Sequence, residues 1–580
     1  MGTRILHRHP LAAPAALVAA LLLWGIPAAI ARAGTPSLAA ISEAYFASEF
    51  RASPVFATET GVHDYDAQLD DVSPAGHAAR AERLDAVLAR VSALDPASLT
   101  PTERDDREIF IGWINGQLLE ERTVQLWRHD PNRYVVFGLN AINWLIIRSF
   151  APAADRLALV IARERLLPRM LHDAEANLTA MPPVYIEMAL ENLAGAGPFL
   201  ERDVPAAFAS VDDPQRQAQL RAAGKEAVAA FDRFREFLEG RKPTAHGQFA
   251  IGREAFIGLL RSSLIDATPE QVLAAGQAQL RRDRAAFDRV SAEVDRSHPE
   301  RAYDDIGADH PSAAQLVSTV RAQVVELRRF IEQHHIATLP ANVMPAVEET
   351  PAFRRAAVFG ELDWPGPLET RATESYYYIT PPNPADPAAE QEKMLRLWNR
   401  YTLQTVSVHE ALPGHFLQGI YRQSHAGWSM IRQVIHVFMA EEGWAHYAEQ
   451  MMVDEGLEAG NPRTRLAQLS MALLRDCRLV DAVQMHVNGV NLVDATRTMR
   501  EDCAIPEVQA YKEARRGTED PGYFCYALGK LEILKLREDV RKAEGPAFSL
   551  QRFHDRFLAA GLVPIMIIRR ELTGRDDPSL

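Results

Sequence analysis

The chain has 580 residues, of which 47% are hydrophobic and 24% are charged, and its formal net charge is -14. These proportions are typical of a folded protein with a sizeable core, and they exclude an intrinsically disordered chain. Because lysine and arginine form no basic stripe, the acidic balance also argues against a nucleic-acid-binding protein.

Residues 1–33 have the features of a secretory signal peptide. Arg4 and Arg8 precede an apolar run that ends near Ile30, and small residues follow up to Ala33. A retained membrane anchor is the alternative, but the small residues favour cleavage. No cysteine follows the run for lipid attachment, and no other stretch is apolar for long enough to span a membrane. We therefore expect a mature protein that is periplasmic or secreted and has no membrane contact.

Apolar residues recur every three or four positions along most of the chain, which is the pattern of amphipathic helices. Ser73 and Thr268 each precede a proline, as capping residues do at the start of a helix. The predicted fold class is therefore mainly α, with a large helical body. The clearest helical segments are 75–94, 213–240, 268–295 and 312–335.

A proline-rich stretch at 336–391 interrupts this helical pattern. Within it, "RRAAVF" (354–359) and "SYYYIT" (375–380) have the composition of strands, so a small sheet is expected. We place a boundary near residue 340. It divides an N-terminal helical part, 34–340, from a part that contains the sheet and the chemistry, 341–580.

The stretch "HEALPGH" at 409–415 has the residues of a zinc site in an unusual spacing. In the HExxH pattern the second histidine follows the first by four residues, whereas His415 follows His409 by six. On a regular helix these two side chains would point about 120° apart and could not share a metal. The Pro-Gly pair at 413–414 predicts a break in the helix that brings His415 back to the metal. Glu410 then lies where a general base is needed.

A third ligand is expected from "EGWAHYAE" at 442–449. Glu442 and Glu449 are seven residues apart and therefore share one face of a helix. We assign Glu442 as the ligand and Glu449 as the acceptor that orients a ligating histidine. Glu441 points about 100° away from that face. The predicted cofactor is one zinc ion.

Together these motifs resemble the hallmark of a bacterial, mostly secreted family, number 885 in the series of domains of unknown function. Its pattern is HEAxPGH followed by EGWAxYxE. The family is similar to gluzincin metallopeptidases, with a helical body like that of thimet-oligopeptidase-like and carboxypeptidase-Taq-like enzymes. This resemblance implies zinc on His409, His415 and Glu442, with Glu410 as base. His446 replaces a residue that is usually apolar in the family, so it is not counted as a ligand. Further similarity lies in "SPVFATETGVHDYDAQLDDVSP", "PAVEETPAF", "YYYITPP" and "DPGYFCYALGKLEILKLR".

Several other residues are candidates for contact with substrate. Tyr526 and His486 are candidates for the donor that stabilises the oxyanion, and Lys530, four residues after Tyr526, could also reach the cleft. Packing roles are the alternative for Tyr526 and His486. Tyr377 and Tyr378 would bind an extended peptide if their strand lies at the edge of the sheet; a purely structural strand is the alternative.

Only three cysteines are present, Cys477, Cys503 and Cys525. They form neither a disulfide framework nor a CxxC metal site. An oxidising compartment allows one bridge among them, and buried free thiols are the alternative.

The predicted function is a secreted zinc-dependent peptidase with a peptide substrate. Short extended peptides are expected to be cleaved in preference to folded proteins, because a folded chain would first have to unfold at a cost of about 5 to 15 kcal/mol. The alternatives are a metal-dependent hydrolase of non-peptide amides or esters, and a catalytically silent zinc protein that binds peptides. The presence of Glu410 argues against the silent protein, since a structural zinc site needs no base.

Overall fold

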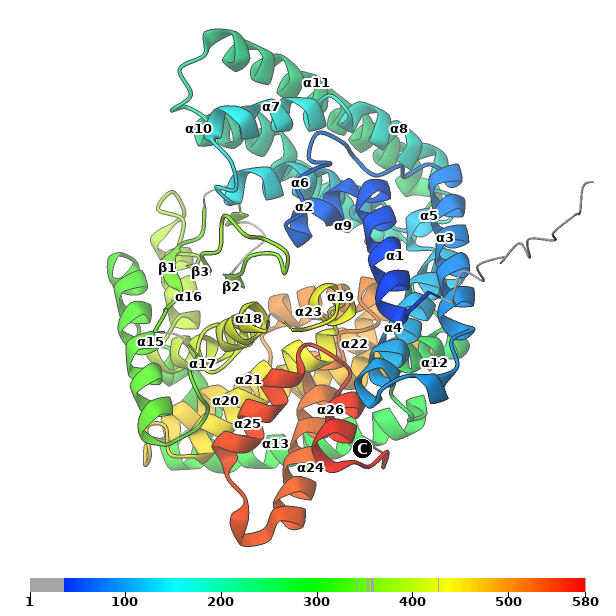
Figure 1. Cartoon of the computed structure of the whole chain (residues 1–580). Coiled ribbons are helices and arrows are strands. Elements are labelled where there is room, and N and C mark those ends of the chain that lie inside the picture. The colour runs from blue at the N-terminus through cyan, green and yellow to red at the C-terminus, as the bar shows by residue number, and fades with distance from the viewer. Residues whose placement is uncertain (1–35, 341, 352–353, 356–358, 426, 579) are drawn as a thin grey trace, which may run out of the picture. The chain divides into compact units, whose positions relative to one another are not determined.

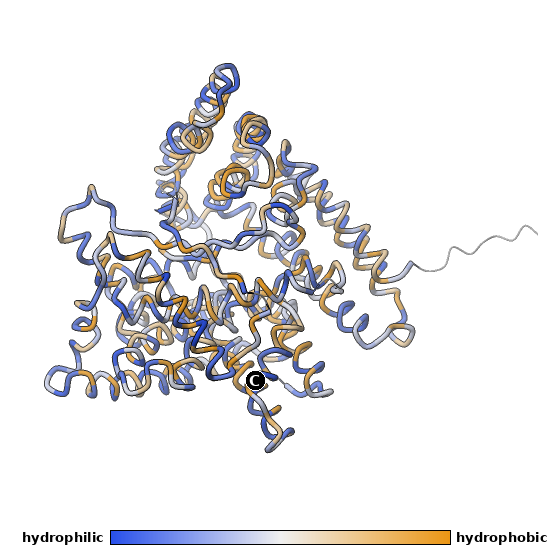
Figure 2. Tube along the Cα trace, turned by 60° about the vertical axis from the view of Figure 1, so that its left-hand side comes forward, coloured by the Kyte–Doolittle hydropathy of each residue, from blue (hydrophilic) through white to orange (hydrophobic). Residues whose placement is uncertain are grey.

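Helices make up most of the chain in the computed structural model, which describes residues 36–340, 342–351, 354–355, 359–425, 427–578 and 580. The mainly α fold class is therefore confirmed. The predicted signal peptide lies outside the described residues. Residues Leu38–Leu580 form one compact unit, in which apolar and polar positions alternate along the helices (Figure 2).

The helices before the sheet include all four of the predicted segments. Side-chain oxygens of Ser73, Asp213 and Thr268 cap three of these helices at their N-termini. In chain order, from blue to green in Figure 1, the helices are α1 (Leu38–Ala52), α2 (Pro54–Thr60), α3 (Pro74–Ser92), α4 (Pro101–Leu119), α5 (Leu126–His129), α6 (Pro131–Ile147), α7 (Ala153–Glu164), α8 (Leu167–Asn177), α9 (Pro183–Pro198), α10 (Val204–Ala207), α11 (Pro214–Arg241), α12 (Arg253–Ser262), α13 (Pro269–Val294), α14 (Ala302–Ile306) and α15 (Leu316–Gln333).

The helices after the sheet carry the motifs singled out above. They are α16 (Ala388–Leu397), α17 (Arg400–Glu410), α18 (His415–Ser424), α19 (Met430–Val434), α20 (Phe438–Asp454), α21 (Pro462–His486), α22 (Leu492–Glu501), α23 (Glu507–Glu519), α24 (Cys525–Glu544), α25 (Leu550–Ala560) and α26 (Ile565–Thr573).

Two large hydrophobic clusters hold these helices together. The larger cluster contains residues from both sides of position 340, from Leu38 to Ile568. The second lies almost wholly within residues 134–238, where α6 to α11 pack on one another, and these helices form the upper part of Figure 1. The boundary near residue 340 stays a prediction, although the larger cluster crosses it.

The sheet has three short strands, β1 (Ala346–Glu349), β2 (Gly360–Asp363) and β3 (Tyr376–Ile379), in the order β1-β3-β2. β3 is parallel to β1 and antiparallel to β2. The strand expected from "SYYYIT" is thus confirmed. In "RRAAVF", residues 356–358 lie outside the described residues, and Arg354 and Arg355 are not in a strand.

The expectation that this tyrosine-rich strand would bind peptide at an edge is wrong. β3 is the middle strand, so both of its backbone edges already pair with protein strands. Tyr377 is fully buried, and its hydroxyl lies 3.4 Å from that of Ser407 on α17. Tyr378 is also buried and packs under the guanidinium of Arg354. The composition of these residues indicates a strand but does not give its place in the sheet.

A disulfide joins Cys477 on α21 to Cys503, just after α22. Cys525 is a buried free thiol at the start of α24. Of the two alternatives left open by the sequence, the structure therefore has the single bridge.

Glu164 at the end of α7 is an ionisable group in an apolar place. Its side chain is buried, and neither carboxylate oxygen has a hydrogen-bond partner among the described residues. Burial raises the pKa of Glu164 from 4.5 to about 8. The folded protein therefore holds this proton at pH values where the unfolded chain releases it.

The pH dependence of stability should reveal this proton. Because the unfolded state binds fewer protons between about pH 4.5 and pH 8, Glu164 should reduce stability by roughly 1.4 kcal/mol per pH unit as pH rises through this window. Glu164→Gln cannot ionise, so its stability relative to the wild type should increase from pH 5 to pH 8. Urea unfolding at several pH values measures the difference. A difference that does not change with pH would show that the carboxyl ionises normally.

Candidate metal centre

The predicted break between the two histidines is present. α17 ends at Glu410 and α18 begins at His415, so the four residues between them lie outside both helices. Only glycine fits at Gly414, because an added Cβ would collide with the backbone of His409. The indole N–H of Trp444 on α20 donates a 2.8 Å hydrogen bond to the carbonyl of Pro413. This bond fixes the interrupted segment to the helix that carries the third ligand.

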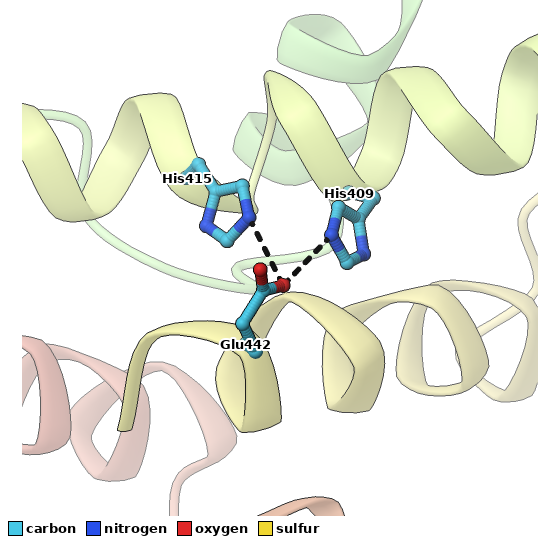
Figure 3. A group of neighbouring side chains, drawn as sticks. All are labelled: His409, His415 and Glu442. Atoms are coloured by element: carbon cyan, nitrogen blue, oxygen red, sulfur yellow. Dashed lines mark ion pairs between the residues drawn. The ribbon is translucent and has the colours of Figure 1, made fainter. Parts of the chain in front are cut away.

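The break brings His409 and His415 together over Glu442 (Figure 3). Their ring centroids are 4.7 Å apart. The Nε2 atom of His409 lies 3.2 Å from Oε2 of Glu442, and that of His415 lies 3.5 Å from the same oxygen. The predicted ligand residues thus converge, with their three candidate ligand atoms all within 4.8 Å of one another.

These distances fit a tetrahedral metal ion. Zinc binds histidine nitrogen and carboxylate oxygen at about 2.0 to 2.2 Å, so two ligand atoms on a tetrahedron should be roughly 3.4 Å apart. Glu442 Oε2 is buried and has no hydrogen-bond partner among the described residues. A buried carboxylate oxygen that faces two imidazole nitrogens is suited to bind a cation together with them.

Acceptors behind the ligands hold both imidazole rings. Glu449 Oε1 lies 2.7 Å from Nδ1 of His409, as predicted from the seven-residue spacing. Gln418 Oε1 lies 3.3 Å from Nδ1 of His415, and its amide donates to the carbonyl of Ala440. With Nδ1–H donated in this way, each Nε2 lone pair is directed at the metal position. Gln418 was missed from the sequence, although its position three residues after His415 on one helix was a usable signal.

The carboxylates of this group act on the histidines. Burial alone would lower the pKa of His415, but its contact with Glu442 and the charges of Glu442, Glu441 and Glu410 outweigh burial and raise it to about 10. The group therefore attracts positive charge, which a metal ion supplies.

Glu410 follows the first ligand directly and does not contact the other two. Its Oε2 accepts a 2.9 Å hydrogen bond from the backbone N–H of Leu362 on β2. Burial raises the pKa of Glu410, and the neighbouring Glu442 acts in the same direction. A carboxylate that is fixed in place and is a stronger base than usual suits proton transfer.

The backbone of α20 approaches α24 closely at the third ligand. An added Cβ on Gly443 would lie 2.6 Å from the Cα of Gly529. The direct contact between the two main chains therefore fixes the position of Glu442, the residue before Gly443, relative to α24.

The model of the family described as bacterial protein of unknown function (DUF885) matches residues 54–572. The chain belongs to the DUF885 family. Solved structures of similar fold include two candidate lipoproteins. A candidate lipoprotein of unknown function from Shewanella oneidensis is 25% identical, has a TM-score of 0.77, and is matched over 92% of this chain and 99% of that chain. A candidate lipoprotein from Colwellia psychrerythraea is 17% identical, with a TM-score of 0.77 and coverage of 92% and 98%, and shows similarity of fold alone.

No curated protein matches this DUF885 chain. In the part of the chain that the structure describes, none of the helices has both the length and the apolar character needed to cross a membrane.

The remaining acidic and histidine residues of α20 in this DUF885 chain lie outside the group of three. Glu441 contacts His436. His446 is fully buried, with its Nδ1 atom 3.2 Å from Glu449. Its burial, followed by the charge of Lys530, lowers the pKa of His446 to about 4. Neither residue belongs to the set that could share a metal ion.

Tyr526 lies beside the metal centre. Its ring centroid is 6.5 Å from that of His409, and the guanidinium groups of Arg475 and Arg478 lie over the ring at 5.8 and 5.0 Å. Tyr526 therefore remains a candidate for the hydroxyl that contacts substrate.

His486 and Lys530 occupy packed positions instead. The Nε2 atom of His486 lies 2.7 Å from the carbonyl of Gly517, and the side chain is 1% exposed. Lys530 is also 1% exposed, and its ammonium lies 3.6 Å from Asp283. Both side chains are held by protein groups. The sequence did not show this, because spacing along a helix indicates a shared face but does not say whether that face is covered.

Proposed function

We propose that the protein is a zinc-dependent peptidase that acts outside the cytoplasm. The observation that supports this most directly is the convergence of His409, His415 and Glu442, with Glu410 next to them and not among the ligands. A structural zinc site is normally closed by four protein ligands, whereas three ligands leave a position for water. A spare carboxylate beside such a position is the arrangement of a metal-assisted hydrolase.

When bound, zinc would lower the pKa of its water and polarise the scissile carbonyl. Glu410 would accept a proton from the attacking water. Its Oε2 is occupied by the N–H of Leu362, so Oε1 is the atom that takes the proton. In hydrolysis the C–N bond breaks, the water oxygen joins the acyl carbon, and Glu410 delivers the proton to the leaving amine. We assign Tyr526, whose ring centroid lies 6.5 Å from that of His409, as the donor that would stabilise the developing oxyanion.

The free edge of the sheet is suited to hold the substrate backbone. The carbonyl of Phe359 accepts a hydrogen bond from the N–H of Thr380, so the backbone groups of odd-numbered residues in β2 face β3. The backbone groups of even-numbered residues face the opposite side, and there the N–H of Leu362 bonds to Glu410. β2 is an edge strand. The carbonyls of Gly360 and Leu362 and the N–H of Gly360 therefore face the side of the catalytic carboxylate, where an extended peptide can pair with them.

The location is inferred from the relatives and from the N-terminus. The structure from Shewanella oneidensis is named as a candidate lipoprotein, and lipoproteins lie outside the cytoplasm. The predicted signal peptide of this chain agrees with such a location, and the Cys477–Cys503 disulfide is typical of an oxidising compartment.

The test uses the purified protein with one equivalent of zinc and a mixed peptide library, with mass spectrometry as the readout. Cleavage is expected, with loss of activity on chelation and recovery on return of zinc. Non-peptide amides and esters form a second panel. Hydrolysis of this panel alone would favour the non-peptide hydrolase, and peptide binding without hydrolysis of either panel would favour the silent protein.

Substrate size should be limited by access to the ligands. His409 and His415 are only 5% and 8% exposed, so a scissile bond reaches them only on a narrow, extended chain. A peptide should be cleaved at least 100-fold faster than the same sequence in a structured segment of a stably folded protein, because local unfolding must come first. Rates on the two substrates, compared at equal concentration, measure this. Similar rates would mean that the centre is open to folded chains.

A further inference from the structure

A cavity of about 230 Å³ lies beside the metal centre. One lining residue, Leu362, bonds to the proposed base through its N–H. Another, Trp364, has its ring centroid 5.9 Å from that of His415. A group that fills this cavity therefore lies next to the atoms that would act on the substrate.

Most charged side chains in the wall of the cavity neutralise one another. The ion pairs are Arg148 with Asp363, Arg354 with Glu361, His63 with Glu369, and His436 with Glu441. Among the described residues, two lining side chains, Arg422 and Glu59, have no ion pair. Arg422 and Glu59 are therefore the lining side chains whose charges are free to act on a bound ligand.

Arg422 is a partly buried guanidinium whose protein partner is a carbonyl group. Its Nε and Nη2 both donate to the backbone oxygen of Gln433, at 3.2 and 2.6 Å. Nη1 has no hydrogen bond among the described residues. Burial lowers the pKa of Arg422 to about 10, so the group still carries its positive charge at neutral pH. Glu441 supports that charge, but its carboxylate contacts His436.

Glu59 forms no ion pair with Arg422 among the described residues. The protein atoms around Glu59 displace water and raise its pKa. The charge that influences Glu59 is that of His436, and Arg422 is not among its partners. Arg422 is therefore a positive group in the cavity wall that forms no ion pair among the described residues.

Arg422 also lies at a defined distance from the metal ligands. It follows His415 by seven residues on α18, which is two turns on one face and about 10 Å along the axis. Long side chains on a helix point back towards its N-terminus, which here is the end that carries His415. An extended peptide advances about 3.3 Å per residue, so roughly three residues or fewer fit between the two groups.

We propose that this cavity binds a carboxylate of the peptide substrate through Arg422, within about three residues of the scissile bond. The proposal rests on the proposed peptidase function and gives it a substrate class. Two sources supply the same chemistry: the C-terminal carboxylate of the peptide, or an Asp or Glu side chain near the scissile bond. A guanidinium with free N–H groups binds either in a charge-assisted hydrogen bond.

The test measures binding to zinc-loaded Glu410→Gln protein, in which turnover does not interfere. Peptides of one sequence carry either a free C-terminus or a C-terminal amide. A second set of amides carries Asp at one of three successive positions, with Asn at the same position as reference. In at least one set, loss of the carboxylate should weaken binding roughly 10- to 100-fold, the usual effect of one charge-assisted hydrogen bond. The set that responds identifies the source.

Variants of Arg422 assign the effect to this residue. In the same background, Arg422→Gln should bring the affinity ratio between acid and amide peptides close to one. Arg422→Lys should lower the ratio several-fold, because an ammonium group cannot form the forked contact. Arg355→Gln is the matched control: it removes an arginine paired with Glu349 outside the cavity and should leave the ratio unchanged. A ratio is compared within one preparation, so partial misfolding does not distort it.

Equal binding of acid and amide peptides in both sets would overturn the proposal, and so would an unchanged ratio in the Arg422 variants. If Arg422→Gln does not fold, an unchanged ratio in Arg422→Lys has the same meaning. Failure of the peptidase function is recognised separately, as absence of cleavage by the zinc-loaded wild type even where binding discriminates between the peptides.

Discussion

Glu410→Gln should retain one zinc per chain and lose nearly all turnover, with kcat lower by roughly 100- to 10,000-fold, the usual contribution of a general base. The amide has almost the same shape and can still accept the hydrogen bond from Leu362 N–H through its oxygen, but it cannot take a proton from water. Zinc content and peptide hydrolysis are measured on the same preparation.

The matched control is Glu441→Gln. It changes the same functional group at a carboxylate that contacts His436 and lies outside the ligand group. This variant should keep both zinc and most activity. Substantial activity in Glu410→Gln would be incompatible with the proposed role of the base, and loss of zinc in that variant would mean that Glu410 is a ligand.

Glu442→Ala should lose zinc, whereas Glu441→Ala should keep it. Oε2 of Glu442 faces both imidazole nitrogens, so its removal leaves only two ligands. Loss of a residue that only orients a ligand weakens metal binding roughly 10- to 100-fold, and we expect a larger effect here. Metal analysis after dialysis against a weak chelator measures the difference.

His446→Ala completes this series. His446 contacts the residue that orients His409 and does not reach the metal position, so this variant should bind zinc more weakly than the wild type but more strongly than Glu442→Ala. Equal zinc content in Glu441→Ala and Glu442→Ala would contradict the ligand assignment. Complete loss of zinc in His446→Ala would make that histidine the better candidate.

The candidate metal centre was predictable because its information is local. His409, Glu410 and His415 lie in one short stretch, and Pro413 and Gly414 act on the same helix through backbone geometry. The positions of Glu442 and Glu449 follow from helical periodicity alone. Such rules depend on neighbours within two turns, and the structure confirms the break between the two histidines. The contact of His409 with Glu442 joins two segments that are distant in sequence, and it was expected from the pairing of the two motifs and not from a local rule.

Contacts between distant segments were not predictable in this way. The order of the strands depends on pairing across up to about thirty residues, and the sequence of Tyr377 and its neighbours fits a middle strand as well as an edge. The hydrogen bond from Leu362 to Glu410 joins a strand to a helix. The enclosure of His486 and Lys530 depends on segments that no local pattern identifies.

The contact between Gly443 and Gly529 sets a mechanical tolerance on the metal centre. Metal–ligand bonds accept errors of about 0.2 Å, which is far less than the shift needed to fit one methyl group between two main chains that already touch. The spacing between α20 and α24 therefore determines the position of Glu442. Gly443 is not a ligand, yet it limits how precisely the three ligands can meet. A side chain at position 443 would shift Glu442 and weaken metal binding without altering any ligand.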